Sequence, residues 1–346
     1  MLKLNGLKKW SVALCGTLAL ACFMGCSDDS SSPSKASAEV PTSSAVPTSS
    51  VEPTSSVVPT SSDDPALLSS ASDPSVVTES SSASTPATPV ASGDFATTLA
   101  GAAPDADGFY DIGDVYKAAP ATSKIAFVIR HSKREKNNLG QESTLTPIGI
   151  QMAQDAGAKL AGGDETFYYT STDFVRTKET CRNIAIGRGE ADPEIHVWDG
   201  IDGGYFYTVP TDTLDALMSK RGGSSRYIAQ WAYGDPMSNN YVAQHSVGYF
   251  YDLFERGKQF INEVVVANMP NWKRVSILAS HDLLVLPLIV YVSNRTIDLK
   301  IYDSGKWVNY LSGIAVIVDE SGALTVLPIR GADVGYMIAR DEVSEE

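Results

Sequence analysis

Cysteine is scarce in this sequence. Of the four cysteines only Cys181 lies beyond residue 26, so the main part of the chain has no partner for an internal disulfide. A zinc site built on a Cys-x-x-Cys pair is excluded for the same reason. Cys181 stands in a predicted helix, and we interpret it as a small buried residue rather than a nucleophile.

Positive charge is also in deficit. The chain has 27 Lys and Arg against 41 Asp and Glu, for a formal net charge of −14, and residues 94–346 alone carry −10. Since no run of Lys or Arg occurs after the first nine residues, we expect no nucleic-acid partner. A surface of this sign repels phosphorylated anions, so any phosphate site has to be a local basic pocket.

Apolar runs long enough to span a bilayer are missing as well. The longest apolar run, residues 10–24, follows three lysines (Lys3, Lys8 and Lys9) and has the length of a signal-peptide core. Residues 1–26 are therefore predicted to be a secretory signal. An uncleaved membrane anchor is the alternative interpretation.

The end of this segment resembles a bacterial lipobox. Phe23-Met24-Gly25-Cys26 places a small residue before a cysteine, and a polar tract begins directly after it. The resemblance implies cleavage before Cys26 and lipidation of its thiol, which would anchor the protein to a membrane of the bacterial cell envelope by lipid alone. Cleavage before Cys22 is the competing possibility.

Residues 27–93 consist mainly of Ser, Thr, Pro, Val and Ala. Pro-Thr-Ser-Ser recurs at Pro41, Pro47, Pro53 and Pro59, and aromatic residues are absent from this tract. Such a segment buries too little apolar surface to offset its conformational entropy. We therefore predict a disordered stalk over residues 27–93 and a single folded domain over residues 94–346.

Within residues 94–346, apolar runs alternate with helical patterns. This alternation predicts an α/β fold, a three-layer sandwich with a largely parallel central sheet flanked by helices. The expected strands are 125–129, 167–169 and 275–279, with a hairpin formed by 314–318 and 323–327. The expected helices are 145–160, opened by Thr146 and Pro147, then 173–186, most of 239–268, and one beginning at Asp282.

Polar residues follow three of these predicted strands. Arg130 and His131 follow the first, residues 171–176 follow the second, and His281 and Asp282 follow the third. Sites in such sheets form beyond the carboxyl ends of the strands, so we expect these groups to meet. Arginines suit a phosphate dianion because the guanidinium donates several hydrogen bonds and carries a positive charge.

These segments resemble the motifs of the histidine phosphatase superfamily, which has the phosphoglycerate-mutase-like fold. The four matching segments, in the family's order, are Arg130-His131, Leu145-Thr146-Pro147-Ile148-Gly149, Ser171 to Thr177, and Ser280-His281-Asp282. The resemblance covers residues 124–329. It implies that His131 is a catalytic nucleophile that forms a phosphohistidine, and that Arg130, Arg176 and His281 bind the phosphate. No metal or organic cofactor is implied.

Arg134 is a further phosphate-binding candidate, since the acid phosphatase branch of the family has an arginine at this spacing. In that branch the proton donor to the leaving group maps to Asp282. In the mutase branch the donor lies in a later segment, where Asp199 stands. We favour Asp282 because Arg134 points to the same branch, and Asp199 stays open. Ser132 departs from the family pattern, which has glycine there.

The sequence therefore predicts an exported, lipid-anchored enzyme that hydrolyses phosphate monoesters through His131. Its substrate would be a phosphorylated small molecule or macromolecule. The alternative is a surface lipoprotein that keeps the same fold and binds a phosphorylated ligand without turning it over. The proton donor separates the two hypotheses, because only an enzyme needs one.

Overall fold

The computed structural model describes residues 95–339, except for 137, 139, 219–222 and 235–248. The chain divides into two units, Met1–Ser80 and Ser81–Glu346, and all described residues belong to the second. The predicted signal, the stalk and Cys26 lie outside the described residues and stay predictions. No helix within the described part of the chain is long and apolar enough to cross a membrane.

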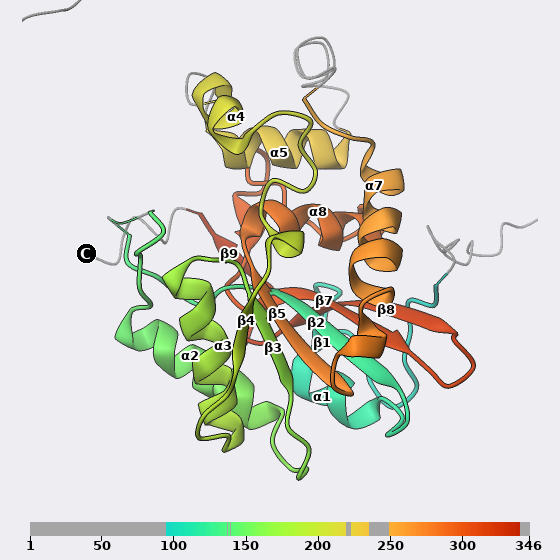
Figure 1. The fold of residues 1–346 in the computed structure, drawn as a ribbon. Helices are drawn as coiled ribbons and strands as arrows, with labels where there is room; N and C mark the ends of the chain where they lie inside the picture. The colour runs from blue at the N-terminus through green and yellow to red at the C-terminus, as the bar shows by residue number, and fades with distance from the viewer. Residues whose placement is uncertain (1–94, 137, 139, 219–222, 235–248, 340–346) are drawn as a thin grey trace, which may run out of the picture. The chain divides into compact units, whose positions relative to one another are not determined.

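A sheet of seven strands forms the centre of the fold (Figure 1). Four of its six strand pairings are parallel, and β7 runs antiparallel to both of its neighbours. The predicted α/β class with a largely parallel sheet and the predicted hairpin are thus confirmed. The strands, in sheet order, are β1 (Tyr110–Asp111), β8 (Leu324–Arg330), β7 (Ser312–Val318), β2 (Lys124–Arg130), β5 (Val275–Ser280), β3 (Tyr168–Ser171) and β4 (Ile195–Val197).

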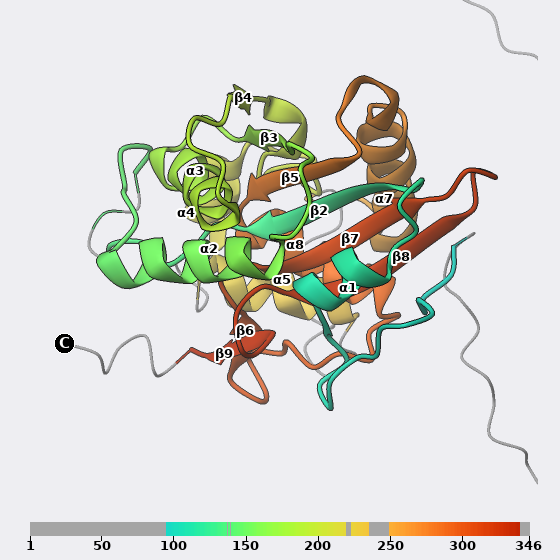
Figure 2. The same cartoon turned by 90° about the horizontal axis from the view of Figure 1, so that it is seen from below.

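Helices cover both faces of the sheet, as Figures 1 and 2 show. Successive side chains of β2 point to opposite faces of the sheet, so this strand contributes to two separate hydrophobic cores. Ile125, Phe127 and Ile129 pack with α1, α2 and α3 on one face, whereas Ala126 and Val128 pack with α5, α7 and α8 on the other. The helices are α1 (Ile112–Ala118), α2 (Pro147–Lys159), α3 (Val175–Arg188), α4 (Thr211–Met218), α5 (Ser224–Tyr233), α7 (Leu253–Gln259) and α8 (Asp282–Val292).

The start of α2 follows the sequence prediction closely. The Oγ1 of Thr146 accepts a hydrogen bond from the Gly149 backbone N–H at 3.0 Å, and Pro147 occupies the first turn. α8 follows β5 directly and is buried over Leu284–Val292, as expected for a helix that is apolar all round.

The helix predicted for most of 239–268 is shorter than expected. Residues 235–248 lie outside the described residues, and the helix begins only at Leu253, because the Asp252 carboxylate caps the N–H groups of Phe254 and Glu255. Phe250 instead forms an isolated β-bridge with Tyr207. After Gln259 the helix continues as the π-helical η3 (Phe260–Val266) and ends near the 3-10 helix η4 (Met269–Asn271).

Besides α1, α4, α5 and β4, several short elements were not expected from the sequence. β1 and the small second sheet, β6 (Lys306–Val308) with β9 (Tyr336–Ile338), contain two or three residues per strand. The 3-10 helix η1 (Asp199–Ile201) follows β4 at the edge of the main sheet. η1 and the β6–β9 pair adjoin residues that line the polar cavity described next.

Candidate active site

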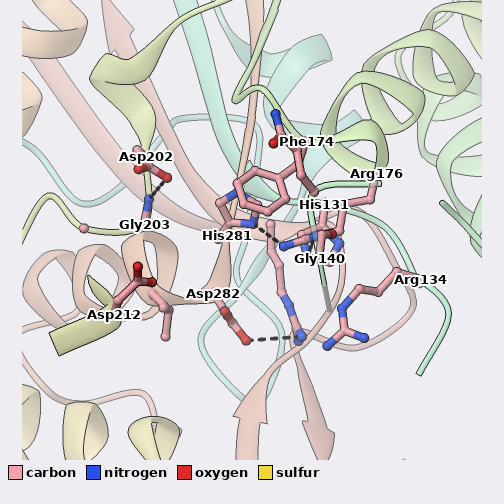
Figure 3. A pocket seen from close by; sticks show the side chains of 14 residues that line it. His131, Arg134, Gly140, Phe174, Arg176, Asp202, Gly203, Asp212, His281 and Asp282 are labelled. Carbon is pink, nitrogen blue, oxygen red and sulfur yellow. Dashed lines mark hydrogen bonds and ion pairs between the residues drawn. The ribbon is translucent and has the colours of Figure 1, made fainter. Parts of the chain in front are cut away.

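Three adjacent strand ends bring the predicted motifs together. β5 pairs with β2 on one side and with β3 on the other, in a register that sets Arg130 opposite Ser280 and Ser171 opposite Ala279. The residues that follow these strands surround a cavity of about 450 Å³ (Figure 3). Its lining residues are Arg130, His131, Arg134, Gly140, Gln141, Phe174, Arg176, Asp202, Gly203, Gly204, Asp212, His281, Asp282 and Leu283.

His131 presents one unprotonated ring nitrogen toward this cavity. Its Nδ1–H donates to the carbonyl oxygen of Ser132 at 2.8 Å, which leaves Nε2 to accept a hydrogen bond from the Nε–H of Arg176 at 3.2 Å. Burial lowers the pKa of His131 well below its ordinary value, and the neighbouring His281, Arg130 and Arg176 lower it further. The imidazole is therefore neutral, with a lone pair on Nε2.

His281 stands edge-on to His131, with ring centroids 5.6 Å apart. Its Nδ1 accepts from a terminal nitrogen of Arg176 at 3.4 Å, so its Nε2–H is the donor to Thr172 Oγ1 at 3.0 Å. Burial lowers the pKa of His281 to about 3, and the charges of Arg176 and Arg130 oppose protonation as well. Both histidines are thus neutral near pH 7, and the positive charge of the cavity comes from its arginines.

Arg176 links the two histidines. The residue is 7% exposed, and its guanidinium contacts both rings and donates through Nη1 to the carbonyl oxygen of Gly140 at 2.9 Å. Burial lowers its pKa to about 10, and the nearby Arg134 adds to that shift, yet the side chain stays charged at neutral pH. Arg134 is less buried, and its Nη1 donates to the carbonyl oxygen of Glu135 at 2.7 Å.

Arg130 and Asp282 form an ion pair on the floor of the cavity. Nη2 of Arg130 lies 3.3 Å from Oδ2 of Asp282, as the lower dashed line in Figure 3 shows. Burial raises the pKa of Asp282, but the charge of Arg130 and a hydrogen bond from Trp307 outweigh this and hold it below its ordinary value. Asp282 is thus a carboxylate in this arrangement. The Nε–H of Arg130 is buried and has no hydrogen-bond partner within the described part of the chain.

Ser132, where the family pattern has glycine, is fully buried beside His131. Its Oγ donates to the carbonyl oxygen of Gly149 at 2.6 Å, and its N–H donates to Thr180 Oγ1 at 2.9 Å. These bonds tie the segment that follows β2 to α2 and α3. Gly149 is needed for this contact, because a Cβ on it would lie 1.9 Å from the carbonyl oxygen of Lys133.

A family match covers the strands and helices that surround the cavity. Residues 126–297 match the family described as the histidine phosphatase superfamily (branch 1). The chain belongs to the histidine phosphatase superfamily. This superfamily includes phosphatases and mutases, and membership supports a phosphatase or mutase-like activity. The matching branch does not confirm the acid-phosphatase features expected from Arg134 and Asp282.

Several solved structures resemble the chain at low sequence identity. A phosphoglycerate mutase from Bacillus anthracis is 18% identical, with 60% of this chain and 93% of that chain covered and a TM-score of 0.40. A mutant phosphoserine phosphatase from Entamoeba histolytica, solved with phosphoserine, is 17% identical, with 59% and 94% covered and a TM-score of 0.38. A putative alpha-ribazole-5'-P phosphatase from Escherichia coli is 15% identical, with 60% and 96% covered and a TM-score of 0.36. None of the curated proteins matches the chain.

Six of the seven predicted site residues of this superfamily member line the cavity, namely Arg130, His131, Arg134, Arg176, His281 and Asp282. Asp199 does not, which corrects its placement. It begins η1 with an exposed side chain, and the turn of η1 brings Asp202 to the cavity instead. Figure 3 shows Asp202 and Asp212 at the side of the cavity nearest Gly203.

The lining residues that the sequence analysis did not single out come from loops, from α4 and, for Leu283, from α8. Phe174 and Gln141 flank Arg176, Asp202 and Gly203 follow η1, and Asp212 lies in the first turn of α4. Two of them left a signal in the sequence: Phe174 lies within the segment Ser171 to Thr177, and Asp202 stands three residues after Asp199. Among the described residues no group of three or more His, Cys, Asp or Glu side chains is placed to hold a metal ion.

Proposed function

We propose that the protein hydrolyses phosphate monoesters through a phosphohistidine on His131. The observation that carries this proposal is the state of His131: its Nε2 is unprotonated, faces a cavity, and lies among three arginines. A nucleophile of this kind is activated by a depressed pKa, since the neutral ring has the lone pair that attacks phosphorus.

The arrangement suits a phosphoryl group. Arg130 has a buried Nε–H without a partner among the described residues, and Arg176 already donates to the atom that would attack. Arg134 lines the same cavity. Their donors would stabilise the negative charge that is spread over the transferred oxygens in the transition state. Because both histidines are neutral, the lone pair of His131 is available while the arginines supply the charge.

The proposed reaction has two steps. In the first, Nε2 of His131 forms a bond to phosphorus while the bond from phosphorus to the leaving oxygen breaks, and that oxygen receives a proton. In the second, water attacks the phosphohistidine, the phosphorus–nitrogen bond breaks, and inorganic phosphate leaves. The balance requires a proton donor in the first step and a proton acceptor in the second.

We assign the donor to Asp282. It lines the cavity beside Arg130, whereas Asp199 is exposed outside it. Among the described residues, both side chains that contact its carboxylate, Arg130 and Trp307, reach Oδ2, which leaves Oδ1 as the oxygen that would carry the proton. A phosphate dianion in the cavity would place negative charge beside Asp282 and would compete for Arg130. Both effects raise its pKa and so favour the protonated carboxyl when the substrate is bound.

We favour a phosphatase over a mutase because residues 1–26 are predicted to be a secretory signal. A secretory signal would remove the protein from the cytoplasmic pathway that a glycolytic mutase serves.

We propose a lipid-anchored location in a bacterial cell envelope. Metabolic labelling with a palmitate analogue in a bacterial host tests this: the label should be incorporated by the wild-type chain and lost in Cys26→Ser, and labelling of both would contradict the proposal.

The decisive measurement is phosphate release from p-nitrophenyl phosphate by the full-length chain between pH 4 and pH 8, with a chelator present. We expect turnover by the wild type and a loss of at least about 10⁴-fold in His131→Ala. A rapid acid-quench experiment with a 32P-labelled substrate should trap the phosphohistidine. A folded wild-type chain that binds inorganic phosphate but releases none from p-nitrophenyl or alkyl phosphates would instead support the non-catalytic binding protein.

A further inference from the structure

The family match ends at residue 297, and the segment that follows contacts two residues of the cavity lining, Arg130 and Asp282. Arg130 donates through Nη1 to the carbonyl oxygen of Val308 at 2.6 Å and approaches the Met337 sulfur at 3.3 Å. The ring of Tyr310 lies under the same guanidinium, 4.2 Å from its carbon. The β6–β9 pair thus holds the Nη1 end of the Arg130 guanidinium.

Trp307, in β6, contacts the carboxylate that is proposed to donate the proton. Its indole Nε1–H donates to Oδ2 of Asp282 at 3.0 Å, the same oxygen that lies 3.3 Å from Arg130. Trp307 is 5% exposed and packs in the core that contains α8, so its ring is fixed from behind. A donor that is itself held rigidly fixes the carboxylate that it binds.

We propose that Trp307 is a positioning residue for the proton donor: it holds Oδ2 of Asp282, so that Oδ1 faces the leaving group and carries the proton. This inference rests on the proposed function for its catalytic meaning. Because an indole donor stabilises the charged carboxylate, Trp307 also sets the pH at which Asp282 gains and loses its proton. Residue 307 would thereby determine the pH range in which the enzyme works.

The test compares Trp307→Phe with Trp272→Phe in the full-length chain. The control residue packs on Tyr168 and Trp198, away from the cavity lining. With an alkyl phosphate as substrate, we expect the alkaline limb of kcat against pH, which reports loss of the donor's proton, to move upward by about one pH unit in Trp307→Phe. Trp272→Phe should leave the profile in place. An unshifted profile, or a uniform loss at every pH, would overturn the proposal.

A second measurement does not depend on turnover. In ¹H–¹⁵N spectra the indole N–H resonance of Trp307 should move with pH as Asp282 titrates, and this movement should vanish in Asp282→Asn. The resonance is assigned by its loss in Trp307→Phe or, if that variant does not fold, by elimination through Phe variants of the other tryptophans. A resonance that ignores Asp282 would refute the inference. A titrating resonance in a chain without turnover would refute the proposed function alone.

Discussion

Arg176 donates its Nε–H to Nε2 of His131, the atom proposed to attack phosphorus, across 3.2 Å. A substrate phosphate has to take over this donor before the nitrogen can act. The proposed nucleophile is thus held by the group that is proposed to bind the phosphate. The bond also aligns the ring, because Arg176 is anchored at its other end by the Gly140 carbonyl.

Replacing Arg176 should therefore affect both binding and chemistry. We expect Arg176→Ala to lower kcat/KM by roughly 10²–10³-fold, since one transition-state donor is removed and the His131 ring loses its partner. Arg176→Lys should recover only part of this, because an ammonium cannot contact both histidines at once. Steady-state kinetics measure the effect, and a change confined to KM would show that Arg176 acts in substrate binding alone.

The donor assignment predicts a dependence on the leaving group. Asp282→Asn should slow the hydrolysis of an alkyl phosphate by about 10²–10⁴-fold, but that of p-nitrophenyl phosphate much less, because nitrophenolate leaves without a proton. Asp202→Asn is the matched control, as Asp202 lines the same cavity. If the leaving-group dependence appeared in Asp202→Asn instead, the donor would be Asp202.

Thr172 should be needed to orient His281. Its Oγ1 accepts the Nε2–H of His281 at 3.0 Å and also lies 3.0 Å from Thr177 Oγ1. Thr172→Val keeps the shape but leaves that N–H buried without a partner, so we expect kcat/KM to fall by about tenfold with a loss of roughly 1–3 kcal/mol in stability. Thr172→Ser should restore both. Failure of the serine variant to restore activity would show that packing, not the hydroxyl, is what counts.

Gly149 should tolerate no side chain. A Cβ there meets the Lys133 carbonyl oxygen at 1.9 Å, so Gly149→Ala has to push the segment that follows β2 away from α2. We expect a loss of roughly 2 kcal/mol in urea unfolding together with a lower kcat. Gly163→Ala is the control, because the nearest atom to its Cβ is the Tyr116 hydroxyl at 3.3 Å. Equal losses in the two variants would contradict this account.

The depressed pKa of His281 should make stability fall in acid. The unfolded chain binds a proton on this residue near pH 6.5, whereas the folded chain does so only at about pH 3. Stability from this residue is therefore present above about pH 6.5 and is lost progressively as the pH falls toward 3. Urea unfolding at pH 7 and pH 5 should show a smaller difference in His281→Gln than in the wild type. An unchanged difference would mean that His281 titrates normally.

Much of the site could be predicted because its residues follow long apolar strands. The runs that became β2 and β5 are buried on both faces, so their ends could be located, and with them Arg130, His131, His281 and Asp282. The start of α2 was equally clear, since Thr146 and Pro147 give a local signal. In each case the pattern lies within a few neighbouring residues.

The parts that could not be predicted depend on distant contacts. β6 has three residues and no periodicity, so nothing in the sequence indicates that Trp307 reaches Asp282. The choice between Asp199 and Asp202 is made by the single turn of η1, which no pattern of polar and apolar residues specifies. The start of α7 was missed because capping by Asp252 prevailed over an apolar pattern that extends further.

The order of strands in the sheet has a consequence for how the molecule acquires its site. β5 lies between β2 and β3, although it follows β3 by more than a hundred residues in the sequence. A nascent chain that ends before Val275 therefore cannot join its first two motif-bearing strands. Closing so long a loop is entropically costly, which makes such pairings slow to form. His131 should acquire its partners late in folding, after nearly the whole domain has been synthesised.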